Sequence, residues 1–144
     1  MAEIPMVGTW RLLEWYNATG DGARSHPLGR DAVGYISYTP QRHVFAQIMA
    51  MGRASYSGSD PFGGNPAEDG AAVKSQISYA GLYSFHGHHV VHHVTLASFP
   101  NWVGTDQVRK VAWQGDRLTL SAEGVVFQGQ EVTAFLDWAR TSGA

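Results

Sequence analysis

Glycine and proline divide this chain of 144 residues into short runs in which apolar and polar side chains alternate. Alternation with a period of two is typical of strands with one buried face, and Gly and Pro mark the turns between them. The polar tract 52–70 predicts a long loop, and Pro66 predicts the start of one short helix with acidic residues in its first turn. About eight strands are predicted, at residues 7–17, 32–39, 43–51, 75–85, 89–99, 106–114, 117–122 and 131–140.

The number of strands and the shortness of most connections indicate the fold class. Gly115-Asp116 lies between two alternating runs and is a two-residue hairpin signal. An antiparallel meander of this length closes well into an up-and-down barrel, which leaves no exposed edge; a sandwich is the competing architecture. We therefore expect one all-β domain over residues 1–144, a barrel of about eight to ten strands that is filled by side chains or holds one small ligand.

Composition excludes several classes of function. The formal net charge is -2, so the chain has no basic footprint for nucleic acid. Cysteine is absent, which excludes a disulfide scaffold, a thiolate metal site and a cysteine nucleophile. No run approaches the ~18 apolar residues of a membrane span, so we expect a cytoplasmic protein with no membrane partner. Whether it forms a homo-oligomer stays open.

Five histidines lie within residues 86–93. His86, His88 and His89 flank a predicted hairpin tip, where solvent satisfies them. A metal site would need about three ligands converging on one point, and the pattern matches no such site, so we predict no metal. His92 and His93 must point to opposite faces of their strand. The more aliphatic companions of His92 predict that it is the interior one and a candidate general acid–base.

Further polar candidates lie on the neighbouring predicted strands. Tyr79 and Tyr83 share a face with Gly81, so two phenols bracket a position without a side chain, which would leave room for a ligand ring. Arg109 is expected to face inward, where a guanidinium needs a carboxylate, a carbonyl or a ligand anion, and Glu14 is one candidate partner. Trp102, in the loop 100–104, suits a lid over the barrel mouth. The remaining predicted ligand contacts are Tyr16, Gln47 and His93.

The first strand carries a family signature. Gly8-Thr9-Trp10, followed by Arg11-Leu12-Leu13, resembles the G-x-W opening strand of lipocalin-type barrels, and the chain as a whole resembles the small lipocalin-like domain family of bacteria and fungi. The resemblance implies that Trp10 closes the barrel floor under Arg140. It also implies that Tyr79, His92 or His93, and Arg109 line the cavity. The segments that carry it are 7–15, 34–39, 79–83, 91–95, 100–109 and 115–120.

The resemblance leaves three functions open, because lipocalin-type barrels include carriers as well as isomerases, cyclases and lyases. The first is a cofactor-independent enzyme acting on an apolar or aromatic substrate, with His92 and Tyr79 handling protons while Arg109 steadies an enolate or carbonyl oxygen. The second is a carrier of a small hydrophobic ligand, and the third is a filled barrel. No common catalytic or phosphate-binding motif is present. The number of polar residues expected inside favours the enzyme over the carrier.

Overall fold

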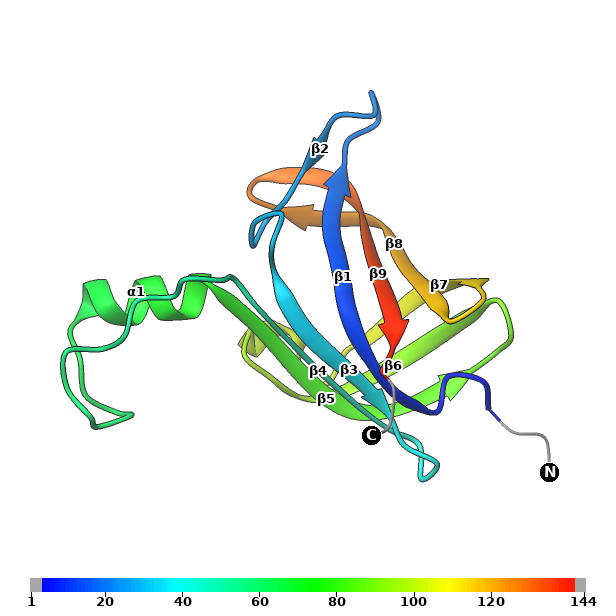
Figure 1. Ribbon diagram of the computed structural model, residues 1–144, viewed down its shortest axis with the longest axis horizontal. Helices are drawn as coiled ribbons and strands as arrows, with labels where there is room; N and C mark the ends of the chain where they lie inside the picture. Colours follow the sequence, from blue (N-terminus) through cyan, green and yellow to red (C-terminus); the bar gives the residue numbers. More distant parts are fainter. Residues whose placement is uncertain (1–3, 142–144) are drawn as a thin grey trace.

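The computed structural model describes residues 4–141 and shows a closed antiparallel barrel (Figure 1). Each long strand pairs with the next along the chain, and the last pairs back onto the first, which closes the barrel and excludes a sandwich. The predicted fold class is confirmed. The strands are β1 Gly8–Ala18, β3 Val33–Tyr38, β4 His43–Met49, β5 Gln76–Phe85, β6 His89–Ala97, β7 Asp106–Gln114, β8 Arg117–Phe127 and β9 Gln130–Arg140, with the short β2 Arg24–Ser25 added beside the end of β1.

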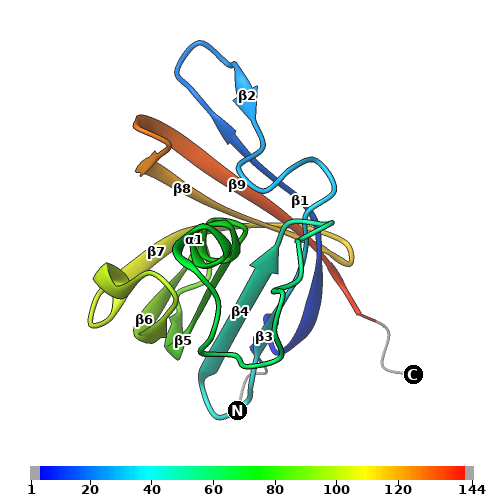
Figure 2. The same cartoon turned by 90° about the vertical axis from the view of Figure 1, so that its left-hand side faces the viewer.

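The helix α1, Pro66–Lys74, begins where it was predicted. Asn65 caps it, and Glu68 completes a capping box by accepting from the backbone N–H of Asn65. Figures 1 and 2 show that α1 and the preceding loop project from the barrel at the end where β5 begins. A second, short helical turn, η1, spans Pro100–Trp102. Neither helix in the described part of the chain is long and apolar enough to cross a membrane.

One end of the barrel is closed as the G-x-W signature implied. Trp10 is 1% exposed, and the Arg140 guanidinium lies 4.2 Å from the centre of its ring. The same guanidinium donates hydrogen bonds of 2.9 Å to the carbonyls of Pro5 and Val7. A Cβ on Gly8, where φ is +133°, would lie 2.7 Å from Arg140 Nη1. Glycine in this motif therefore leaves room for the cation that covers the tryptophan.

Bulges change the strand pattern at two places where sequence alternation gave a different answer. In β1 the register shifts between Leu12 and Glu14, so Leu13 is an inserted residue. The strand predicted at 117–122 exists, but its predicted end is wrong, because β8 continues to Phe127 through a bulge at 123–124. The turn between β8 and β9 is only Gln128-Gly129, and both residues have positive φ, as a tight hairpin of this kind requires.

Candidate functional site

The end of the barrel opposite Trp10 holds a cavity of about 860 Å³. It is bounded by the last turn of α1, by η1, by the loop after β2 and by the β8–β9 hairpin. Its apolar wall includes Trp15, Leu28, Trp102 and Phe127, and the Trp15 and Phe127 rings meet edge to face at 5.3 Å. This volume falls within the range of about 300–1,000 Å³ that is usual for small-molecule sites.

The polar side of the cavity is formed by β7. Gln107 is buried, and its side-chain oxygen accepts a 2.6 Å hydrogen bond from Nη2 of Arg109. Nη1 of Arg109 donates to the carbonyl of Val108 at 3.1 Å. Two carboxylates also line the cavity, but Asp106 is paired with a histidine and Glu123 with a lysine. Among residues 4–141, no carboxylate forms an ion pair with Arg109. Its charge is therefore available to a ligand.

His92 lies behind this wall in a chain of hydrogen bonds between two tyrosines. Its ring is 0% exposed, with Nε2 at 2.7 Å from the Tyr38 hydroxyl and Nδ1 at 2.8 Å from the Tyr79 hydroxyl. As predicted, His92 rather than His93 faces the interior. The Tyr79 ring contacts the Trp102 ring edge to face, with ring centres 5.8 Å apart. This chain of hydrogen bonds therefore ends next to a residue that lines the cavity.

Burial keeps all three groups of this chain neutral. Desolvation, together with a smaller effect of the positive charge of Arg109, lowers the pKa of His92 from 6.5 to about 3. Burial also raises the pKa of the Tyr38 and Tyr79 phenols. Two of the three residues predicted to be catalytic, His92 and Tyr79, are hydrogen-bonded to each other, and the third, Arg109, lines the cavity. At neutral pH the imidazole has one N–H and one bare nitrogen, and both are engaged.

Glu14 and Tyr16 do not face the cavity, which corrects the sequence prediction. The bulge at Leu13 reverses the alternation, so Trp15 points inward in their place. Glu14 instead pairs with His26 at 3.0 Å rather than with Arg109. Tyr16 stacks on an aromatic ring of β9, with ring centres 5.0 Å apart, and Arg24 covers it at 4.1 Å.

Gln47 and Gly81 also depart from their predicted roles. Gln47 is exposed on the outer face of β4, whose inward residues are all aliphatic. A Cβ on Gly81 would lie 1.9 Å from the carbonyl oxygen of His93, so the glycine permits close approach of β6 and leaves no space for a ligand ring. Tyr83 is buried as expected, but its hydroxyl donates to the carbonyl of Thr39 at 2.9 Å, away from the cavity.

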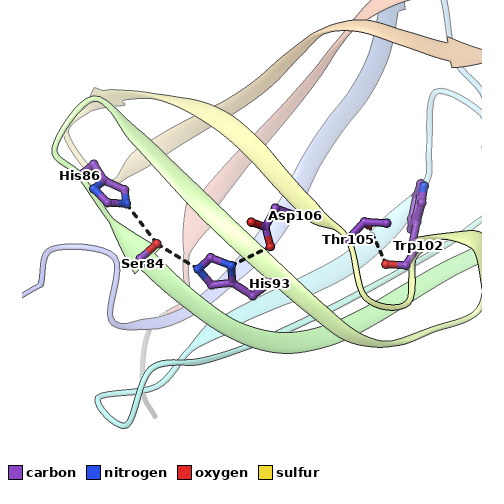
Figure 3. Close-up of polar contacts among 6 residues, drawn as sticks. All are labelled: Ser84, His86, His93, Trp102, Thr105 and Asp106. Atoms are coloured by element: carbon purple, nitrogen blue, oxygen red, sulfur yellow. Dashed lines mark hydrogen bonds and ion pairs between the residues drawn. The ribbon is translucent and has the colours of Figure 1, made fainter.

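His93 belongs to a row of polar side chains on the outer face of the barrel (Figure 3). Its Nδ1 lies 2.8 Å from Asp106 Oδ1, and its Nε2 lies 3.1 Å from the Ser84 hydroxyl, which also contacts His86. The His93 side chain is 42% exposed and that of Asp106 is 64% exposed. His93 is therefore not a cavity residue, which corrects its prediction as a ligand contact. Trp102, by contrast, lines the cavity as expected.

The other tip histidines lie at the turn between β5 and β6. His86 and His89 stack with ring centres 4.6 Å apart. Within residues 4–141 no group of three or more His, Asp or Glu is arranged to hold a metal ion. The absence of a bound metal stays a prediction.

Sequence reasoning missed several cavity and chain residues. Tyr38 is 1% exposed, and its alternation with Ile36 in the predicted strand 32–39 was a signal that it points inward. Gln107 shares the face of Arg109 and carries the same signal. Strict alternation puts Trp15 on the face opposite to Glu14 and Tyr16, and nothing in an apolar run marks the inserted residue that reverses this. Phe127 was assigned to a turn.

Similarity to a known protein family extends over the whole barrel. The family model for the lipocalin-like domain matches residues 7–141. A relative from Aspergillus oryzae (strain ATCC 42149 / RIB 40), named 4'-hydroxy-3'-methoxypropiophenone carrier protein ppsC, is 32% identical over 104 residues, covering 66% of this chain and 94% of that protein. A crystal structure of an uncharacterized protein from Bacteroides eggerthii DSM 20697 is 13% identical with a TM-score of 0.47, covering 94% of this chain and 99% of that one. The family match spans every strand of the barrel.

Proposed function

Because the chain belongs to the lipocalin-like domain family, we propose that it binds a small aromatic molecule in the mouth of its barrel and acts as a carrier. The observation that carries the proposal is the cavity of about 860 Å³, with Trp15, Trp102 and Phe127 in its wall. Arg109 lies on its polar side, and its charge is not paired with any carboxylate of residues 4–141. Aromatic walls favour a ligand ring, while the guanidinium favours an oxygen with partial or full negative charge. The relative's name, a carrier of a phenolic ketone, supports the same ligand class.

The test is a titration with 4'-hydroxy-3'-methoxypropiophenone, followed by the fluorescence of the cavity tryptophans. Saturable quenching with one ligand per chain is expected. Arg109→Met should weaken binding by about tenfold, the equivalent of about 1.4 kcal/mol for a charge-assisted hydrogen bond. Trp102→Ala should weaken it by a similar factor because it opens the wall. Gln47→Ala, on the outer face, is the matched control. Absence of saturable binding, or equal loss in the control, would contradict the proposal.

A second candidate is the cofactor-independent enzyme, an isomerase, cyclase or lyase. The chain Tyr38–His92–Tyr79 favours it, because hydrogen-bonded phenols and an imidazole can pass a proton towards the cavity wall. The carrier stands first because His92 is fully buried, both its ring nitrogens are engaged, and a pKa of about 3 makes it a weak base. This order reverses the preference drawn from the sequence.

The enzyme candidate has a test that needs no known substrate. An acid–base enzyme that forms an enolate should exchange the protons next to the ketone of the bound propiophenone for deuterium in D2O. His92→Gln should slow this exchange by ~10²–10⁴-fold, the usual loss for a general acid–base group, while His93→Gln should leave it within a few fold. Proton NMR of the ligand measures the rate. Exchange no faster than in buffer would leave only the carrier.

A further inference from the structure

Three side chains of β5, β6 and β7 are connected like the Ser–His–Asp triad of hydrolytic enzymes (Figure 3). His93 Nδ1 lies 2.8 Å from Asp106 Oδ1, and His93 Nε2 lies 3.1 Å from the hydroxyl oxygen of Ser84. In such a triad the carboxylate accepts from the Nδ1–H, and Nε2 takes the proton of the nucleophile. The arrangement occurs on unrelated folds and in different chain orders, so its geometry identifies it. Each of the three groups here has the partner that these roles require.

The register of these strands brings the three side chains together. His93 in β6 is directly opposite Asp106, the first residue of β7, and Ser84 in β5 is opposite Val91, two residues before His93. Side chains that are opposite or diagonal on one face of a sheet lie within contact distance. Ser84 and His93 do not line the ligand cavity, whereas Asp106 does. A reaction at Ser84 would therefore take place outside the cavity.

The carboxylate sets the direction of the hydrogen bonds. An ionised carboxylate can only accept, so a neutral His93 carries its ring proton on Nδ1 and has a bare Nε2. The Ser84 hydroxyl then donates to Nε2, which is the contact that a general base needs before it removes a proton. His86 Nε2 also lies 3.1 Å from the Ser84 oxygen. Because the single hydroxyl proton is used by His93, a neutral His86 takes part in this contact as the donor, through its Nε2–H.

We propose that Ser84 is the nucleophile of a second site, at which small esters acylate it, with His93 as the general base and Asp106 as the residue that positions the ring. The Ser84 oxygen bonds to the carbonyl carbon of the ester, and its proton passes to His93 Nε2. The bond from that carbon to the alcohol oxygen then breaks, and the alcohol leaves with the proton. Water attacks the acyl group in the same way, which releases the acid and restores Ser84. The His86 N–H lies beside the nucleophile and can donate to the carbonyl oxygen, which becomes negative in between.

The surface around Ser84 favours an ester with an aryl or short acyl group. Leu82, opposite His93, and Val108, opposite Val91, are about half exposed on the same face. Together with Val91 they form an apolar surface next to the nucleophile, on which such a group can pack. The site is open to water, which weakens the electrostatic effect of the carboxylate on the ring. The expected reaction is therefore a slow hydrolysis of activated esters.

The nucleophile is tested with a fluorophosphonate, which forms a stable bond to activated serines. Mass spectrometry of the intact chain and of its peptides should find one label, on Ser84. His93→Gln should slow the labelling by ~10²-fold, the lower end of the usual loss for a general base, because the site is open to water. His88→Gln is the matched control, since His88 is an exposed histidine of the same turn, and it should leave the rate within a few fold. No label on Ser84, or an equal rate in His93→Gln and the wild type, would overturn the proposal.

Hydrolysis of p-nitrophenyl acetate tests the ester class. Ser84→Ala should lower the rate above that of buffer by at least about tenfold, because only direct attack by surface imidazoles remains. In wild-type samples quenched during turnover, mass spectrometry should find an acetyl group on Ser84. His88→Gln again serves as the control, here for hydrolysis that does not involve the serine. A rate in Ser84→Ala equal to that of the wild type would overturn the proposal.

Asp106→Asn tests the positioning role with a readout that a loss of stability would not produce. Its amide can donate to Nδ1, so the ring proton of His93 is expected to move to Nε2, where it prevents transfer of the Ser84 proton. At mildly alkaline pH, long-range ¹H–¹⁵N NMR should find the proton on Nδ1 in the wild type and on Nε2 in the variant, and His93→Gln identifies the signals. Labelling of the variant should be slower by more than about tenfold. A wild-type ring protonated on Nε2 would overturn the proposal, and so would an unchanged labelling rate in Asp106→Asn.

Discussion

Acidification should destabilise this protein through His92, whose ring is buried in the folded state and hydrated in the unfolded chain. Burial lowers the pKa of His92 from 6.5 to about 3. Below pH 6.5 the unfolded chain therefore binds a proton at this residue that the folded protein does not bind. Since the pKa of a base is lowered by folding, the stabilisation is complete above pH 6.5 and is lost as the pH falls from 6.5 towards 3.

The size of the effect follows from the same two values. At pH 5 the histidine is almost fully protonated in the unfolded chain and neutral in the folded protein. The free energy of unfolding is therefore lower by about 2 kcal/mol than at pH 7.5. Urea unfolding at the two pH values measures this loss. His92→Gln keeps one donor and one acceptor but does not titrate, so its loss between the two pH values should be smaller by about 2 kcal/mol. The comparison cancels the contribution of the other titrating groups.

His93→Gln is the matched control, because His93 is the next residue in β6 but has a side chain that is 42% exposed. It should retain most of the acid sensitivity of the wild type, because desolvation, the largest cause of the lowered pKa of His92, is unchanged. Equal losses in the wild type and in His92→Gln would refute the reasoning, since they would mean that the buried ring is not held neutral by desolvation. Where His92→Gln does not fold, NMR titration of the His92 ring in the wild type decides the same question.

Three further predictions concern the frame around the site. Arg140→Met should lower the free energy of unfolding by about 2 kcal/mol, because it removes a cation from above Trp10 and two hydrogen bonds to backbone carbonyls. Urea unfolding measures the change, and a value below about 0.5 kcal/mol would contradict the role of Arg140 in closing this end of the barrel. Gly81→Ala should lower the free energy of unfolding by more than about 3 kcal/mol, because its Cβ would lie 1.9 Å from the carbonyl oxygen of His93; a melting temperature equal to that of the wild type would show that β5 and β6 are not as close at this position as described. Gln47→Ala should leave ligand affinity and stability nearly unchanged, and a large loss of affinity would place a ligand on the outer face.

Local patterns were sufficient to predict the eight long strands, apart from the end of β8, as well as the helix start and the interior position of His92. Each depends on the residue's own neighbours: alternation sets the facing of a side chain, and proline with a following acidic pair sets the start of a helix. The closure of the floor by Trp10 and Arg140 came from the resemblance to the lipocalin-like family, and the structure confirms it.

The tertiary structure alone decided which residues of β1 face the cavity. A strict alternation of inward and outward side chains does not allow for an inserted residue. Because Leu13 is inserted in a bulge, Trp15 rather than Glu14 lies on the inner face. The meeting of Tyr38 with His92 could not be predicted either, because the two residues are 54 positions apart in the chain. Their contact depends on the register of several strands and on the closure of the barrel, which the sequence determines only through the packing of all the strands at once.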